Sequence, residues 1–194
     1  VAEVDAREAA LRGAPQVSAL PRPHTSEGRQ LRRWLTQLLV TELVIAREAA
    51  ALGVTVTATT PTQDEVLPDL TARLEIGSIA ASVLTDPLAR AVFDHITRDV
   101  DVEEAAVADY HSRNPRRFAR ARGADGWLRP GPDPGIDEVR PHIAALLRGA
   151  ARRQAFRRWL DQRRAELVLL ALMFLYSIGA VELTEGGGVR RCVS

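Results

Sequence analysis

Residues 27–52 read EGRQLRRWLTQLLVTELVIAREAAAL, and this stretch decides the fold class. Its apolar residues recur at steps of three and four, which is the period of one face of an α-helix. Thr25 or Ser26 can cap the first amides, and Gly53 follows where a helix would end. A helix with so wide an apolar stripe must bury it against other elements. The stripe consists of Leu31, Trp34, Leu35, Leu38, Leu39, Val44, Ile45, Ala49 and Leu52.

The rest of the chain also favours helix. Ala and Leu carry most of the apolar content and aromatic residues make up only 5%, a mixture typical of helices rather than strands. A capping box at residues 62–65 (TQDE) begins one predicted helix, Asp86-Pro87 begins another, and Asp101 caps a third. We therefore predict an all-α fold of about six helices with no β-sheet. The predicted helices span residues 3–12, 27–52, 63–83, 86–98, 102–114 and 136 to at least 165. Pro68 and Gly77 are expected to distort the third of them.

Proline, glycine and β-branched residues mark the connections. Residues 14–24 contain three prolines and residues 119–135 are rich in Gly and Pro, so both are predicted loops. Residues 54–60 are rich in Val and Thr and are interpreted as an extended linker. We expect a single helical domain over residues 1–165, followed over residues 166–194 by an apolar helix extension and a disordered tail.

Composition excludes several classes of protein. The chain has 194 residues and 46% hydrophobic content, which is enough for a core. All 26 basic residues are Arg, but the net charge is only +1, so we expect no nucleic-acid partner. Cys192 has no second cysteine for an internal disulfide, and residues 1–11 lack the apolar run of a signal peptide. We therefore expect a cytoplasmic protein.

The sequence contains no motif for a metal site or a catalytic nucleophile. No two of the four histidines lie four residues apart, and no Cys-x-x-Cys occurs, so a zinc site would need ligands brought together by tertiary structure. The Gly-x-Ser-x-Gly pattern of serine hydrolases is also absent. We predict no catalytic residues, no metal and no cofactor. The histidines are His24, His95, His111 and His142.

Aromatic residues are the main candidates for a binding surface. They could line a groove for apolar peptide segments, and core packing is the alternative for those on an apolar stripe, such as Trp34 and Trp159. Trp127 differs because it lies in the Gly- and Pro-rich loop, where we expect it to be exposed. The candidate binding residues are Trp34, Leu38, Tyr110, His111, Phe118, Trp127 and Trp159.

Residues 167–181 form an apolar run of 15 residues that follows Arg163 and Arg164. A helix that spans a bilayer needs about 20 such residues. We predict that the run is a buried or partner-facing end of the last helix, and a membrane anchor is the alternative. The Gly-rich residues 186–194 are expected to be disordered.

Three segments resemble the helical part of parvulin-type foldases, the SurA-like and PrsA-like proteins. Residues 29–54 are similar to that family's long helix, which closes with an acidic residue, small residues and Leu-Gly-hydrophobic. Residues 102–118, with Tyr110 and the Asn114-Pro115-x-x-Phe118 element, are similar to the helix that leads into the isomerase domain. Residues 137–160 are similar to the helix that follows the isomerase and packs back on the N-terminal helices.

The resemblance implies a SurA-like helical domain without its catalytic part. In the family a complete isomerase domain follows the Asn-Pro-x-x-Phe element. Here only the seventeen residues 119–135 separate that element from the last helix, which is enough for a loop but too few for a domain. We therefore expect peptidyl-prolyl isomerase activity to be absent, while the sequence leaves other enzymatic activities open.

These observations lead us to expect a non-catalytic, chaperone-like or scaffold protein that binds apolar or extended segments of an unfolded or partly folded partner protein. The binding site would be an apolar cleft between residues 27–52 and residues 136–165. One alternative is an accessory protein or enzyme of a small-molecule biosynthetic pathway, with a ligand pocket between helices. Another is a membrane-tethered adaptor that uses residues 167–181.

Overall fold

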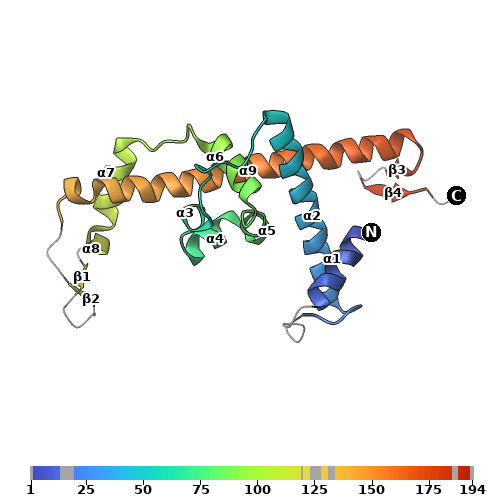
Figure 1. Ribbon diagram of the computed structural model, residues 1–194, viewed down its shortest axis with the longest axis horizontal. Coiled ribbons are helices and arrows are strands. Elements are labelled where there is room, and N and C mark those ends of the chain that lie inside the picture. The colour runs from blue at the N-terminus through green and yellow to red at the C-terminus, as the bar shows by residue number, and fades with distance from the viewer. Residues whose placement is uncertain are drawn as a thin grey trace.

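The computed structural model describes residues 2–13, 20–118, 120–122, 128–130, 134–184 and 188–192. These residues are mostly helical, which confirms the predicted all-α class. One long helix, α9 (Ile136–Ser177), runs the length of the molecule, and the other elements lie along it (Figure 1). The described part holds nine helices rather than about six, because one predicted helix is divided into three and one further short helix is present.

The N-terminal part consists of two helices. α1 (Ala2–Arg12) packs against α2 (Ser26–Leu52), and α2 crosses α9 (Figure 1). The side chain of Thr25 accepts a hydrogen bond from the amide of Gly28 at 3.0 Å, which confirms the predicted cap. Gly53 ends α2 with φ 66°, the left-handed conformation that favours glycine.

A carboxylate fastens α1 to α2. Glu8 is only 8% exposed and accepts hydrogen bonds from Arg12 at 2.7 Å and from Arg32 of α2 at 2.6 Å. Arg32 also pairs with Asp5 at 2.6 Å. The hydrogen bonds from Arg12 and then Arg32 lower the pKa of Glu8 below its ordinary value of 4.5, because they stabilise the ionised form. An ion-pair cluster therefore holds the first helix in place.

The prediction of one helix over residues 63–83 is wrong, because the segment does not form a single element. The segment forms α3 (Gln63–Val66), α4 (Leu70–Ile76) and α5 (Ser78–Val83). The predicted capping box is present at the start of α3, with both of its reciprocal hydrogen bonds.

Two residues account for the division. Pro68 lies between α3 and α4 and lacks the amide that would continue a helix, while Gly77 lies between α4 and α5 with φ 88°. Asp69 is the N-cap of α4, and its carboxylate accepts a hydrogen bond from the amide of Ala72 at 2.8 Å. Because the segment turns at each break, all three short helices direct apolar side chains into one core: Val66, Leu67, Ile76, Ala80 and Val83.

α6 (Pro87–Thr97) begins as the sequence predicts, since the Asp86 side chain accepts from the amide of Leu88 at 2.9 Å. α7 (Glu104–Arg113) begins later than predicted. Asp101 is not its N-cap, because one carboxylate oxygen accepts from the amide of Val102 and from Arg148 of α9, both at 2.8 Å.

Two small hairpins correct the expectation of no β-structure. α7 ends before Asn114, as predicted, and is followed by α8 (Pro115–Phe118) and by β1 (Arg120–Arg122) paired antiparallel with β2 (Leu128–Pro130). The predicted loop over residues 119–135 thus contains a hairpin. Such short local pairings leave no hydrophobic period in the sequence.

A second hairpin lies beyond the end of α9. β3 (Val181–Leu183) pairs antiparallel with β4 (Val189–Arg191), with Glu182 opposite Arg190. The expectation that residues 186–194 are disordered is therefore wrong for the residues of β4. α9 itself includes the apolar residues of the expected helix extension as far as Ser177.

The crossing of α2 and α9 is filled by core side chains. Phe156 of α9 is completely buried, and Leu38 and Ile45 of α2 are 6% and 2% exposed. Phe156 packs edge-on against Phe93 of α6 and stacks on Trp159, with ring centroids 5.3 and 5.5 Å apart. The apolar cleft predicted between residues 27–52 and 136–165 is therefore corrected to a packed core, because the apolar stripes of both helices bury one another.

Two arginines of α9 complete the packing. Arg153 is 7% exposed, and its guanidinium donates to the Glu75 carboxylate at 2.9 Å and to the Val66 carbonyl at 3.5 Å. Its neighbour Arg152 donates to Asp94 of α6 at 2.6 Å. These bonds tie α3, α4 and α6 to the central helix.

Candidate functional site

The predicted binding residues lie in two separate places. Trp34, Leu38 and Trp159 belong to the core region around the crossing of α2 and α9, where Leu38 is buried. The indole nitrogen of Trp34 lies 3.4 Å from the hydroxyl of Ser78, and the ring also lines a surface groove of about 670 Å³. Trp127 lies outside the residues that the structure describes.

The other three predicted residues do come together, where α7 and α8 meet the first turns of α9. The Phe118 ring lies 6.3 Å from both the Tyr110 ring and the His111 ring, measured between centroids, and stacks on the latter. The sequence did not identify two further members. His142 meets Phe118 edge-on at 6.0 Å, and Arg117 donates to the Tyr110 hydroxyl at 2.6 Å.

This aromatic cluster is half-buried and has mainly a packing role. It fixes α8 against α7 and α9, and Asn114 supports the turn by donating from its side chain to the Tyr110 carbonyl at 2.9 Å. The Nε2 atom of His111 is shielded from solvent and has no hydrogen-bond partner among the described residues. Its imidazole stacks on the Phe118 ring, with the two planes inclined at 22°.

At the other end of α9 lie seven of the thirteen large apolar side chains that are exposed among the described residues. We call residues 168–178 the apolar arm. Arg163 pairs with Glu48 of α2 at 3.2 Å, and Leu167 is the last residue of the helix that packs against the core. Beyond this point seven large apolar side chains are half or more exposed: Val168 50%, Leu169 58%, Leu170 53%, Met173 60%, Phe174 62%, Tyr176 58% and Ile178 58%.

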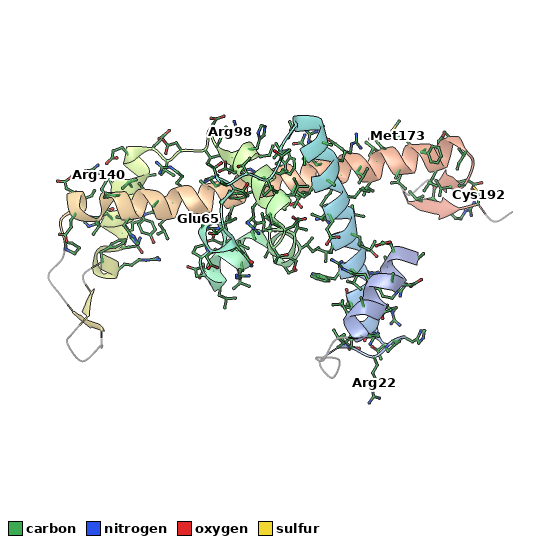
Figure 2. The ribbon with its side chains drawn as sticks, viewed as in Figure 1. Arg22, Glu65, Arg98, Arg140, Met173 and Cys192 are labelled. Carbon is green, nitrogen blue, oxygen red and sulfur yellow. The ribbon has the colours of Figure 1, made fainter. Side chains whose placement is uncertain are left out.

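The β3–β4 hairpin covers one side of the arm and leaves the rest exposed to solvent. β3 contacts α9, and the amide of Cys192 donates to the Ala180 carbonyl at 3.0 Å. Leu172 and Leu175 are therefore half-buried. Figure 2 shows Met173 projecting from α9 away from the side on which Cys192 and the hairpin lie. The hairpin thus positions an apolar helix face without burying it.

The surface also carries grooves of different character. One of about 520 Å³ lies between α4, α7 and α9 and has mostly apolar walls, formed by Val102, Ala106, Leu147, Ala150 and Ala151 among others. Another of about 410 Å³ lies between α6 and the chain that follows α2, and its walls are mostly polar. Sequence reasoning missed both, because each is built from elements distant in the chain.

Two findings concern the possibility of a metal site and that of a membrane-spanning helix. Within the described ranges, His, Cys, Asp and Glu side chains form no group of three or more that could hold a metal ion. Across the same part of the chain, no helix, α9 included, is both long enough and apolar enough to cross a membrane.

Comparison with known proteins gives a limited result. Residues 1–27 match the model of a family described as a family of unknown function (DUF7158). Searches of curated proteins and of solved structures yield no significant match. The matched residues reach from α1 to the start of α2, so the match includes Glu8, Arg12 and two residues that line the groove beside Trp34, Pro21 and Glu27, but not the apolar arm. At the level of sequence, the chain is similar to this family over its first helix.

Proposed function

We propose that this chain is a non-catalytic, chaperone-like or scaffold protein that holds an apolar segment of an unfolded or partly folded partner protein on its apolar arm. The observation that carries the proposal is the exposure of seven large apolar side chains within residues 168–178. Contiguous apolar patches of more than a few hundred Å² are rare on monomeric proteins and mark surfaces that other molecules cover.

The physical basis is the burial of apolar area. Each Å² of apolar surface removed from water contributes roughly 25 cal/mol, so covering several Leu, Met and Phe side chains can offset the ordering of a flexible partner segment. Met173 and Phe174 lie at the centre of the arm and suit a varied partner, because the Met side chain is flexible and the Phe ring offers a large contact area.

The polar surroundings favour a protein over a small ligand as the occupant. The arm is a convex helix face flanked by Glu166 and by the Glu182–Arg190 pair of the hairpin, whose atoms lie 2.8 Å apart. A convex surface cannot enclose a small molecule, whereas a partner chain can lay its own apolar residues along it. The partner site is therefore placed on the arm and not at the α2–α9 crossing, which is filled by core side chains.

The experiment compares two sets of variants with a permanently unfolded probe, reduced and carboxymethylated lactalbumin. The arm variant carries Leu169→Gln, Met173→Gln and Phe174→Gln. The control carries Leu70→Gln and Leu74→Gln on α4, whose side chains are 69% and 71% exposed. We expect the wild-type chain and the control to bind the probe in the tens-of-micromolar range and the arm variant to bind at least about fivefold more weakly.

The outcome is decided by comparison of the three proteins. Equal binding by the arm variant, or no binding by the wild-type chain at tens of micromolar, would exclude the arm as a partner site. If the wild-type chain instead floats with phosphatidylcholine vesicles and the arm variant does not, the arm is a membrane anchor and the proposal fails. Circular dichroism and urea unfolding check that each variant keeps its fold.

A second candidate function is supported by the apolar groove between α4, α7 and α9. Its volume of about 520 Å³ falls in the range of small-molecule sites, so an accessory protein or enzyme of a small-molecule pathway is the alternative. Native mass spectrometry of the purified protein would detect a retained ligand. Ala106→Phe, which fills the groove, should abolish that adduct while leaving binding of the unfolded probe unchanged.

A further inference from the structure

The apolar arm has an uncovered side that faces away from the β3–β4 hairpin. No charged residue occurs between Glu166 and Glu182, and a helix without a polar face is normally buried within a protein. The hairpin covers only the side on which Leu172 and Leu175 lie half-buried. The rest of the arm is left for another molecule to cover.

Four large side chains form this uncovered side. Successive residues of a helix are turned by about 100°, so the four lie within a sector of about 140° that is centred opposite the hairpin side. They recur at steps of three and four residues, which is the stripe along which two helices pack. Their exposed fractions lie between 53% and 62%, and the four are Leu169, Leu170, Met173 and Phe174.

A polar residue marks each end of the uncovered side. At the base, the Glu166 carboxylate accepts hydrogen bonds from Arg163 at 2.8 Å and from Gln162 at 3.0 Å. At the tip, the Ser177 hydroxyl donates to the Phe174 carbonyl at 2.7 Å and is exposed. The uncovered side is therefore an apolar stripe with a carboxylate at one end and a hydroxyl at the other.

The arm of a second copy of this chain matches such a stripe in length and in character. The arm holds seven of the thirteen exposed large apolar side chains among the described residues, and the other six are spread over α2, the chain that follows it, α4 and β4. A pair of arms is also self-complementary, because the same residues supply both surfaces of a twofold interface.

The exposed area is sufficient for a reversible dimer. A side chain of this size has roughly 150–200 Å² of surface, so the seven that are half or more exposed present about 600 Å² on each copy. Two copies together bury up to about 1,200 Å², which is the lower limit of specific interfaces and the range of transient ones. Such an area favours association that is weak enough to be exchanged for another partner.

The ends of the stripe favour an antiparallel pair. In that orientation Glu166 of one copy lies beside the Ser177 hydroxyl of the second copy, which can donate to the carboxylate. In a parallel pair the two Glu166 carboxylates would lie side by side, and so would the Arg163 and Arg164 side chains at the base. Figure 1 shows that α2 crosses α9 at the base of the arm and that only β3 and β4 lie beyond it. An antiparallel pair therefore keeps the bodies of the two copies at opposite ends.

We propose that two copies of this chain associate antiparallel through the uncovered side of the arm, and that this pairing covers the arm until a segment of a partner protein displaces it. Leu169 of one copy packs against Phe174 of the second, and Leu170 packs against Met173. The displacement rests on the proposed function, whereas the pairing does not, so the two can fail separately.

Sedimentation velocity tests the pairing. We expect the wild-type chain and the α4 control to pass from monomer to dimer at tens of micromolar, as the small area implies. The arm variant should dimerise at least about tenfold more weakly, because it replaces three of the four apolar side chains. A wild-type chain that stays monomeric at about 300 micromolar, or an arm variant that dimerises as well as the wild-type chain, would overturn the proposal.

Disulfide cross-linking tests the orientation in a Cys192→Ser background. A mixture of the Glu166→Cys and Ser177→Cys chains, oxidised with copper phenanthroline, should form a linked dimer. Neither chain alone should do so, since its two thiols would lie about 16 Å apart in an antiparallel pair, beyond the reach of a disulfide. The control is Arg158→Cys, which lies outside the arm and should not link to the Ser177→Cys chain. Rapid linking of each chain to itself would mean parallel pairing and would overturn the proposal.

The unfolded probe used above tests the displacement. Saturating carboxymethylated lactalbumin should lower the dimer fraction of the wild-type chain at least about fivefold, because the probe and the second copy compete for the same side chains. If the probe binds while the dimer persists unchanged, the two do not share the arm and the inference is overturned. If the dimer forms but the probe does not bind, the pairing is upheld and the proposed function fails.

Discussion

The Phe93 ring of α6 meets the Phe156 ring of α9 edge-on, with centroids 5.3 Å apart and planes inclined at 65°. Both rings are almost fully buried, and Arg152 lies 5.0 Å from the Phe93 centroid. Edge-to-face contact of this kind adds to the stability that comes from burial alone. The pair therefore joins α6 to α9 within the core.

The first prediction follows from this pair. Phe156→Ala should lower the free energy of unfolding by about 3–5 kcal/mol, because it removes a buried ring and leaves a cavity. Phe174→Ala on the same helix should change it by no more than about 0.5 kcal/mol, since that ring is 62% exposed. Urea unfolding followed by circular dichroism measures both. Similar losses for the two variants would contradict the packing described for α9.

A second prediction concerns the buried arginine. Arg153→Met should destabilise the protein by about 1–3 kcal/mol, because it leaves the Val66 carbonyl and the Glu75 carboxylate without their donor. Arg158→Met is the control, since Arg158 is exposed on the same helix. Thermal unfolding compares the two. If Arg153→Met is as stable as the control, the buried ion pair contributes no net stability.

The third prediction is a pH dependence of α1 docking. The folded-state pKa of Glu8 is lowered, so its contribution is complete above the ordinary value of 4.5 and is lost as the pH falls through the lowered folded value. After correction for the pH dependence of intrinsic exchange, the protection of the α1 amides should fall on acidification before that of the rest of the chain. Glu8→Gln should produce the fast exchange already at neutral pH, and Glu3→Gln, at an exposed position, should not.

A fourth prediction tests the start of α6. Asp86→Ala should cost about 1 kcal/mol, because it removes the acceptor for the Leu88 amide. Asp86→Asn keeps a side-chain oxygen and should restore most of the stability. Equal losses in the two variants would mean that the charge of Asp86, rather than its capping hydrogen bond, supports the helix.

Helix starts could be predicted because their signals are local. Thr25, Asp86 and the box at residues 62–65 each place a side-chain oxygen within three residues of the amide that it accepts from. Distortion of residues 63–83 near Pro68 and Gly77 was expected from the sequence, but a full division into three helices was not, because the pattern of apolar residues continues through the segment. Pro68 and Gly77 are the residues at which the helix breaks, and the turns bring Leu67 and Ile76 into one core.

The candidate sites were predictable to different degrees. Tyr110, His111 and Phe118 were identified from one segment, but their neighbour His142 comes from another helix and carries no signal in the sequence. The apolar run at residues 167–181 was visible, whereas its exposure depends on where α2 and the hairpin stop covering α9. The groove between α6 and the chain that follows α2 was missed because its two walls meet only in the folded chain.

The length of α9 has a consequence for anything that the molecule binds. At about 1.5 Å per residue, its 42 residues extend roughly 60 Å. The aromatic cluster around Phe118 sits near one terminus of this rod and Met173 near the other, while Phe156 and Arg153 anchor the rod between them. Two molecules bound at opposite ends of α9 would therefore be held apart at a separation set by the length of the helix.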